Sequence, residues 1–290
     1  NYRSTPQILA ASNALVDKNR ERLKKELIPV RSGNRKPLYF HAKTSALEAD
    51  WITANMRALH EGEEGVSYSS MGVLYRAHYV SRALEESLIR NKIPYVLYSG
   101  VEFYKRKEIK DVLSYLRMIY NPDDISFLRT VNEPRRGVGR TRIAAIKAYA
   151  AARGCTLYQA LMDNLETDSF RRCKAKDYVR LIEKYRAIFD QMDLTDLLAG
   201  VLHESGYEQM LRTAGEEERL DNLAELKQAI FDFTRKAGET VTLGNYLDHA
   251  ALFTNMDTGE KAQAVKLMTV HSAKGLEFPV VFVCGLSEGI

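Results

Sequence analysis

The feature that most constrains this chain is a break in its secondary-structure pattern. Helix and strand signals alternate through the first hundred residues, give way to helical signals alone from about Glu108 to Ala264, and return as strand signals at Val265. The apolar segments that we interpret as strands are Leu38–His41, Gly72–Tyr75, Pro94–Tyr98, Val265–Val270 and Pro279–Cys284.

An α/β pattern that stops and then resumes indicates one domain inserted into another. We expect residues 1–108 and 265–290 to form an α/β domain with a parallel sheet covered by helices. Residues 109–264 are expected to form an all-α insertion. Two chain crossings would join the two domains, which favours a hinge over a free linker.

Composition excludes several classes of protein. No apolar run approaches the roughly 20 residues that cross a bilayer, so we expect no membrane partner. The 3 cysteines form no CxxC pair and the 6 histidines form no HExxH pattern, which indicates a reducing cytoplasm and no metal within this chain. The N-terminus, Asn1, is neither an initiator methionine nor a signal peptide, so we expect a piece of a longer protein.

No complete active site is visible in the sequence. The patterns GxxxxGK[ST] and GxGxxG are both absent, so no glycine loop of either type is present to hold a nucleotide phosphate. Nucleotide chemistry in this chain would therefore contribute to a site that is built partly elsewhere.

Positive charge is concentrated at the start of the helical region. From Val101 to Arg142 there are ten Lys or Arg against six Asp or Glu, while the net charge of the whole chain is +4. This excess suits either a solvated helix face or a nucleic-acid surface. Within it, Gly100–Asp111 combines aromatic residues with cations, as in proteins that bind single strands. The alternative is a helix start whose aromatic pair packs on the core.

A second basic stretch is Pro134-Arg-Arg-Gly-Val-Gly-Arg-Thr141, directly before a helix. Glycines at this position expose backbone N–H groups at the positive end of the helix, with arginines around them. The stretch resembles a helix-hairpin-helix clamp on duplex backbone, and the alternative is a plain glycine-rich turn.

Two further stretches contain side chains suited to a nucleotide or to DNA. Tyr2 and Arg3 precede the first helix, where they would offer a flat ring and a planar guanidinium. Thr269–Val283, TVHSAKGLEFPVVFV, places a histidine, a lysine and a glutamate between two strands. Taken alone, the first is typical of ordinary surface and the second of a solvated loop.

Five stretches in the same order resemble the C-terminal half of a UvrD/PcrA/Rep-type superfamily 1 DNA helicase. They are NYRS (1–4), VLYR (73–76), RKEIKD (106–111), PRRGVG (134–139) and TVHSAKGLEFPVVFV (269–283). The last is similar to the family's motif V along its length and the first to motif IV. The resemblance covers essentially the whole chain and is looser through residues 160–260.

The resemblance implies a RecA-like fold of the P-loop-NTPase type that lacks its own P-loop. In such helicases two RecA-like domains sandwich ATP and pass single-stranded DNA across their tops. Residues 1–108 and 265–290 would form the second of these domains, and residues 109–264 a helical subdomain that contacts duplex DNA. By position, Tyr2 matches the adenine-stacking tyrosine, Arg3 the catalytic arginine that reaches the γ-phosphate, and Glu277 the glutamate that contacts the ribose.

DNA contacts follow from the same resemblance. It implies single-strand contacts at Thr269, His271, Tyr75 and Arg76. The implied duplex contacts are Arg135, Arg136, Gly137, Gly139 and Arg140. Lys274 receives no role.

Several family features are missing from this chain. The Walker lysine, the acidic pair that binds Mg²⁺ and the final arginine motif are absent, so the first RecA-like domain would hold the Mg²⁺ and the fragment would not hydrolyse ATP alone. The parent protein would be an ATP-dependent 3′–5′ DNA helicase. Its partners would be single-stranded DNA, single/double-strand junctions, its own N-terminal domain and DNA-repair or replication proteins at the bacterial nucleoid.

Two alternatives stay open. One is the matching part of a RecB/AddA-like helicase–nuclease subunit, and the other is a helicase-like DNA-binding module without catalysis.

Overall fold

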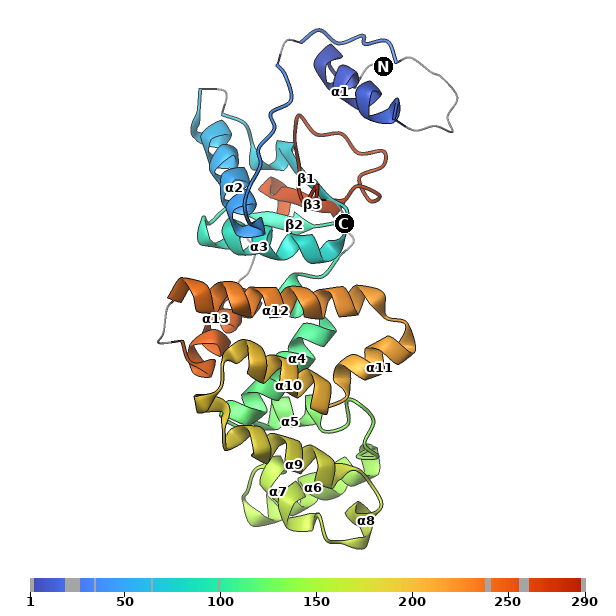
Figure 1. Cartoon of the computed structure of the whole chain (residues 1–290), viewed down its shortest axis with the longest axis vertical. Helices are drawn as coiled ribbons and strands as arrows, with labels where there is room; N and C mark the ends of the chain where they lie inside the picture. Colours follow the sequence, from blue (N-terminus) through green and yellow to red (C-terminus); the bar gives the residue numbers. More distant parts are fainter. Residues whose placement is uncertain are drawn as a thin grey trace.

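The computed structural model describes residues 3–18, 27–33, 35–63, 65–98, 100–237, 241–255 and 261–287. A part built on a sheet and a part built of helices lie end to end along the long axis (Figure 1). Helix α1 (Pro6–Val16) lies at the outer end of the sheet part. The expected α/β class is confirmed.

The sheet has four parallel strands in the order β2-β3-β1-β4. The strands are β1 (Met71–Tyr75), β2 (Tyr95–Leu97), β3 (Val265–Thr269) and β4 (Val280–Val283). Strand β3 lies between β2 and β1, so the chain leaves the sheet after β2 and returns as that strand's direct neighbour. Four of the five expected strands are confirmed.

The expected strand Leu38–His41 is wrong. The segment is irregular, and the Leu38 and Tyr39 side chains are 81% and 84% exposed. Phe40 lies flat on Trp51, with ring centroids 4.7 Å apart and planes at 4°. Only Phe40 of this run therefore packs on α2, and the run forms no strand because strand propensity without a neighbouring strand does not make a ladder.

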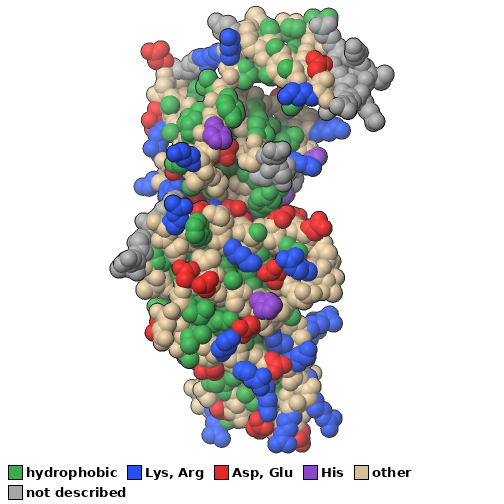
Figure 2. Space-filling model, in the orientation of Figure 1, with side chains coloured by type: hydrophobic (Ala, Val, Ile, Leu, Met, Phe, Trp, Pro, Cys, Tyr) green, Lys and Arg blue, Asp and Glu red, His purple; other side chains and the backbone are tan. Residues whose placement is uncertain are grey.

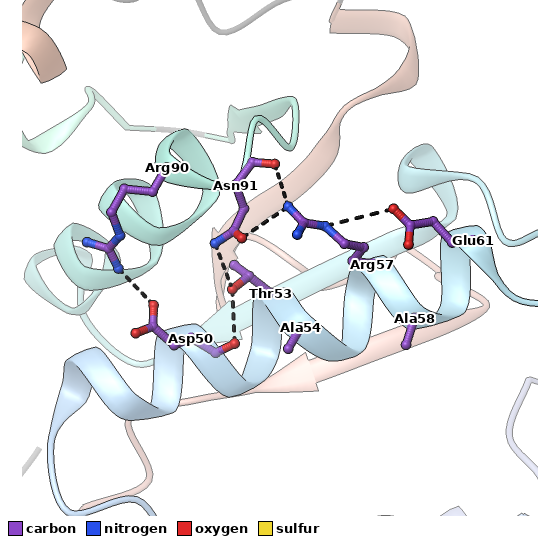
Figure 3. Close-up of a pocket in the computed structure, with 8 residues that line it drawn as sticks. All are labelled: Asp50, Thr53, Ala54, Arg57, Ala58, Glu61, Arg90 and Asn91. Carbon is purple, nitrogen blue, oxygen red and sulfur yellow. Dashed lines mark hydrogen bonds and ion pairs between the residues drawn. The ribbon is translucent and has the colours of Figure 1, made fainter.

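Helices α2 (Ser45–Glu61) and α3 (Ser81–Arg90) pack on the sheet. Alternate residues of β1, among them Met71 and Val73, point into the core between sheet and helices. A polar groove is lined by one face of α2 and by Arg90 and Asn91 at the end of α3 (Figure 3). Its charged groups are paired internally, as in Arg90 Nη2 to Asp50 Oδ1 at 2.7 Å, and none of the predicted site residues lines it.

The helical part has its own hydrophobic core, separate from the core of the sheet part. Its longer helices are α4 (Lys107–Tyr120), α6 (Arg140–Arg153), α9 (Ala175–Arg186), α10 (Leu194–Glu204), α12 (Glu217–Ala237) and α13 (Leu243–Asn255). The shorter helices are α5 (Asp124–Thr130), α7 (Leu157–Asn164), α8 (Asp168–Arg171) and α11 (Tyr207–Ala214). Short helices such as α5 and α8 contain few residues that repeat on one face, so apolar periodicity does not reveal them.

The aromatic pair in Gly100–Asp111, the segment that connects the sheet part to the helical part, packs in the core. Phe103 is fully buried and Tyr104 is 4% exposed, and both belong to the helical core. Neither ring is free to stack on a base, so the interpretation as a single-strand site is wrong and the core-packing alternative holds. Within the described ranges, no helix is long and apolar enough to cross a membrane.

Candidate nucleotide and nucleic-acid interface

The carboxyl ends of β1 and β3 lie side by side at one edge of the sheet. Tyr75 pairs with Thr269 in the parallel register, and the Val270 N–H donates to the Tyr75 carbonyl at 2.9 Å. The next residues of each strand therefore emerge together. Binding sites in open parallel sheets form at such carboxyl ends.

Arg76 and His271 meet at this edge although 195 residues separate them. Arg76 Nη1 lies 3.3 Å from His271 Nδ1 and 3.2 Å from Nε2. One guanidinium nitrogen is therefore almost equally distant from both nitrogens of the imidazole ring. Both side chains are exposed. An exposed guanidinium beside an imidazole suits a nucleic-acid strand, because one group neutralises phosphate and the other offers a ring.

Thr269 supports this pair from below. Its side chain is nearly buried, and its hydroxyl accepts from the Ser272 N–H at 3.2 Å and contacts Ser272 Oγ at 3.0 Å. The hydroxyl thereby fixes the turn that presents His271. Gly275 completes the turn with φ of +91°, a left-handed value that suits glycine.

Tyr75 does not face the same edge. Its side chain is fully buried in the core of the sheet part, and burial raises the pKa of its hydroxyl. A ring without exposed surface has no face for a base, so the expected single-strand contact of Tyr75 is corrected to a packing role.

A second pair lies at the far end of the same loop. Arg3 Nε is 2.6 Å from Glu277 Oε1, with side chains 48% and 57% exposed. Arg31 Nη1 donates to the Arg3 carbonyl at 3.2 Å, which ties the segment after α1 to the start of the chain. Tyr2, the expected adenine-stacking residue, lies outside the described residues.

The β3–β4 loop connects the two pairs. Phe278 anchors it, because a Cβ atom on Gly72 of β1 would lie only 2.8 Å from the Phe278 ring. Lys266 Nζ lies 5.4 Å from the centre of the same ring. Lys274 is exposed, and no hydrogen bond or ion pair of its side chain occurs among the described residues.

The expected duplex-binding turn joins α5 to α6. Asn132 Oδ1 accepts from the backbone N–H groups of Arg136 and Val138, and the Val138 side chain is buried. Gly137 has φ of +79°, and Gly139 caps α6 with open space where a side chain would lie. The first amides of α6 are therefore accessible at its positive end.

The arginines around this turn have different roles. Arg135 and Arg140 are exposed, whereas Arg142 donates from Nε to the Ser169 carbonyl and from Nη1 to the Gly137 carbonyl, both at 2.6 Å. Arg142 thus connects the turn to α8.

Arg136 is a structural residue. It is 7% exposed and donates to the Thr130 and Ser205 carbonyls at 2.9 and 3.0 Å and to the Tyr115 hydroxyl at 2.7 Å. Its guanidinium also lies over the Tyr178 ring. Burial raises the pKa of Tyr115 to about 12, so its hydroxyl stays protonated. The expected duplex contact of Arg136 is therefore corrected: its donors are used inside the protein.

Sequence reasoning missed two cations beside the turn. The Lys174 N–H donates to the Arg136 carbonyl at 2.9 Å, which brings the segment after α8 against the turn. Arg172 and Lys174 are exposed, and no ion pair of either occurs in the described part of the chain. Lys and Arg side chains gather over this end of the molecule (Figure 2). Only the tertiary contact identifies them.

The described residues contain no group of three or more His, Cys, Asp or Glu side chains that could hold a metal ion. At the far end of the β3–β4 loop, the Arg3 guanidinium lies against the Glu277 carboxylate. These groups suit the phosphate and the hydroxyls of a nucleotide.

A family model described as UvrD-like helicase C-terminal domain matches residues 1–290. The chain is similar to the ATP-dependent DNA helicase PcrA of Staphylococcus epidermidis, with 36% identity over 299 residues, and to that of Leuconostoc citreum, with 37% over 305. Its identity to the Bacillus subtilis protein of the same name is 36% over 303 residues. Each match covers 100% of this chain but only 40–41% of the relative.

Replacing Arg136 tests its assignment as a structural residue. We expect Arg136→Ala to lower the free energy of unfolding by about 3–5 kcal/mol, because it leaves several buried acceptors without donors. Arg135→Ala, the adjacent exposed arginine, serves as the control and should change it by less than about 0.5 kcal/mol. Denaturant unfolding of both variants measures the difference. Equally small losses in the free energy of unfolding would contradict the structural role of Arg136.

Proposed function

This chain belongs to the UvrD-like helicase C-terminal domain family, and from this membership we propose that it is part of an ATP-dependent DNA helicase that translocates 3′ to 5′. The chain spans about two fifths of the length of the relatives it matches, so the activity belongs to the longer parent protein. Residues 1–108 and 265–290 are its second RecA-like domain, and residues 109–264 its inserted helical subdomain.

One observation carries the proposal: a single loop links two pairs of functional side chains. Arg76 and His271 lie where the loop leaves β3, and Arg3 pairs with Glu277 near the start of β4. In the proposed function the first pair binds single-stranded DNA and the second binds ATP. A movement of the loop at one pair therefore moves the other pair.

On the ATP side, Arg3 contacts the γ-phosphate and Glu277 accepts from the ribose hydroxyls, while Tyr2 stacks on the adenine. The Arg3–Glu277 pair is half exposed, and pairs of this kind contribute at most about 1 kcal/mol. Exchange of Glu277 for a phosphate at Arg3 is thus inexpensive. Bound ATP supplies the free energy of phosphate transfer, and Arg3 stabilises the charge that develops on the phosphate.

The described residues include no group of three or more His, Cys, Asp or Glu side chains that could hold a metal ion. We assign Mg²⁺ to the first RecA-like domain of the parent protein. Hydrolysis then requires both domains, and the fragment alone is inactive.

The helical part supplies the duplex contact. Arg135 and Arg140 meet phosphates, while Gly137 and Gly139 let the backbone of the turn approach the duplex. Arg172 and Lys174 extend this cationic surface. Contacts to phosphates carry no sequence information directly, so this contact is independent of sequence and suits a single/double-strand junction.

The PcrA relatives favour this reading over the helicase–nuclease alternative. The pairing of Arg3 with Glu277 argues against a non-catalytic module, since such a module has no chemical need for both groups. We place the parent protein in the bacterial cytoplasm at the nucleoid, where its DNA lies, with DNA-repair or replication proteins as partners.

Arg3→Ala in the parent protein tests the ATP role. We expect ATP turnover to fall by about 10³-fold with nucleotide affinity largely kept, because the charge that Arg3 meets develops in the transition state. Lys274→Ala, which removes an exposed cation of the β3–β4 loop that also contains Glu277, serves as the control. Steady-state kinetics with direct nucleotide binding separates the two effects, and equal losses in both would contradict the assignment.

Arg135→Gln with Arg140→Gln tests the duplex contact. The slope of log K against log salt for a blunt duplex should become shallower by about 1.8 units, because each lost phosphate contact removes about 0.9. Arg180→Gln with Lys184→Gln is the matched control, since these α9 cations are paired with Asp177 and Glu204. A slope that is the same in both variants would exclude the clamp.

A further inference from the structure

Two buried arginines join the sheet part to the helical part, and both reach helix α12. Arg82 of α3 is 3% exposed, and Arg106, directly before α4, is 8% exposed. Helix α12 runs across the junction (Figure 1), so its side chains can meet both parts.

Arg106 uses its whole planar fork. Its Nε donates to the Val101 carbonyl at 3.1 Å, and its Nη1 donates to Asn222 Oδ1 of α12 at 2.6 Å. Its Nη2 donates to the His78 carbonyl at 3.0 Å and to Ser81 Oγ at 3.1 Å. These contacts on three sides of one rigid group fix its position, which a lysine could not reproduce.

The α12 side of this contact is itself held. Asn222 is 2% exposed and donates from Nδ2 to Glu108 Oε1 at 2.6 Å. Glu108 also accepts from Arg219 Nε at 3.2 Å. Arg106 therefore meets a preformed acceptor of the helical part and not a mobile side chain.

On the sheet side, Arg106 holds the turn that follows Arg76. The short helix η2 (His78–Val80) begins two residues after Arg76, and α12 packs against it. The His78 ring contacts the Tyr75 ring edge-on at 6.0 Å, and a Cβ on Gly100 would lie 3.1 Å from it. Burial and then Arg106 lower the pKa of His78, so a neutral ring lies beside the guanidinium. The turn is clamped between the sheet core and Arg106.

We propose that Arg106 is a positioning residue that holds the His78 turn so that Arg76 meets single-stranded DNA, with Asn222 of α12 holding Arg106 in place. This inference rests on the proposed function, because it requires Arg76 to bind the strand. Arg106, which is buried at the junction, would thereby affect the affinity for DNA through Arg76 on the surface of the sheet part.

Arg82 provides a comparison within the same junction. It donates from Nε to Glu225 Oε1 at 2.5 Å and from Nη2 to Asp232 Oδ2 at 3.4 Å, both on α12, and from Nη1 to Glu86. Its side chain thus bridges α3 to α12, and within the described ranges none of its side-chain hydrogen bonds goes to the His78 turn. Loosening the junction through Arg82 leaves the proposed clamp intact.

The test is a double-mutant cycle in the parent protein. Affinity for a fluorescent oligothymidine and for a blunt duplex is measured for Arg76→Gln, Arg106→Gln, the two combined, and Arg82→Gln. We expect Arg106→Gln to weaken the single-strand affinity roughly tenfold, because a misplaced Arg76 would lose about one charged hydrogen bond to the strand. The affinity for the duplex should stay unchanged. The combined variant should match Arg76→Gln alone, because Arg106 acts through Arg76.

Each other outcome has a meaning. Additive losses in the combined variant, or an equal loss in Arg82→Gln, overturn the positioning role. No loss in Arg76→Gln contradicts the proposed single-strand contact itself, which separates that failure from this one.

A milder variant keeps the test valid if Arg106→Gln does not fold. Asn222→Ala leaves the guanidinium in place and removes its acceptor on α12, together with the hydrogen bond that Asn222 donates to Glu108. We expect it to weaken single-strand affinity in the same direction and to lose that effect in the Arg76→Gln background. An effect that persists in that background overturns the proposal.

Discussion

Strand β3 pairs with β2 on one side and with β1 on the other, although the whole helical part separates it from both in the sequence. This parallel pairing places the carboxyl ends of β1 and β3 together, which brings Arg76 to His271. It also forces the chain to cross between the two parts twice. The site and the junction are thus two consequences of one strand position.

Arginines carry much of the remaining organisation, and burial decides how each one acts. Buried guanidiniums such as Arg82, Arg106 and Arg136 use their donors on carbonyls and carboxylates inside the protein. Exposed ones such as Arg76 and Arg140 keep donors for a ligand. A buried cation without its acceptors would destabilise the fold, so the first group is fixed by the fold itself.

The sequence predicts the insertion and four strands because apolar periodicity and chain order carry that information. It also predicts that the segment between β3 and β4 contains both His271 and Glu277. The sequence does not predict which side chains are buried. Tyr75 and Arg136 have the residue types of a binding site, yet neighbours from distant helices or strands enclose them. The sequence also misses Lys174, because only the backbone hydrogen bond from Lys174 to the Arg136 carbonyl places this lysine beside the turn.

In the proposed function, the β3–β4 loop couples the Arg3–Glu277 pair, which binds ATP, to the Arg76–His271 pair, which binds single-stranded DNA. The most direct measurement is the single-strand affinity of the parent protein with and without a non-hydrolysable ATP analogue, in the wild type and in Arg3→Ala. Coupling between sites typically changes affinity by about 5- to 150-fold. The account predicts such a change in the wild type and little or none in Arg3→Ala. The same nucleotide-dependent change in both proteins, or none in the wild type, would contradict it.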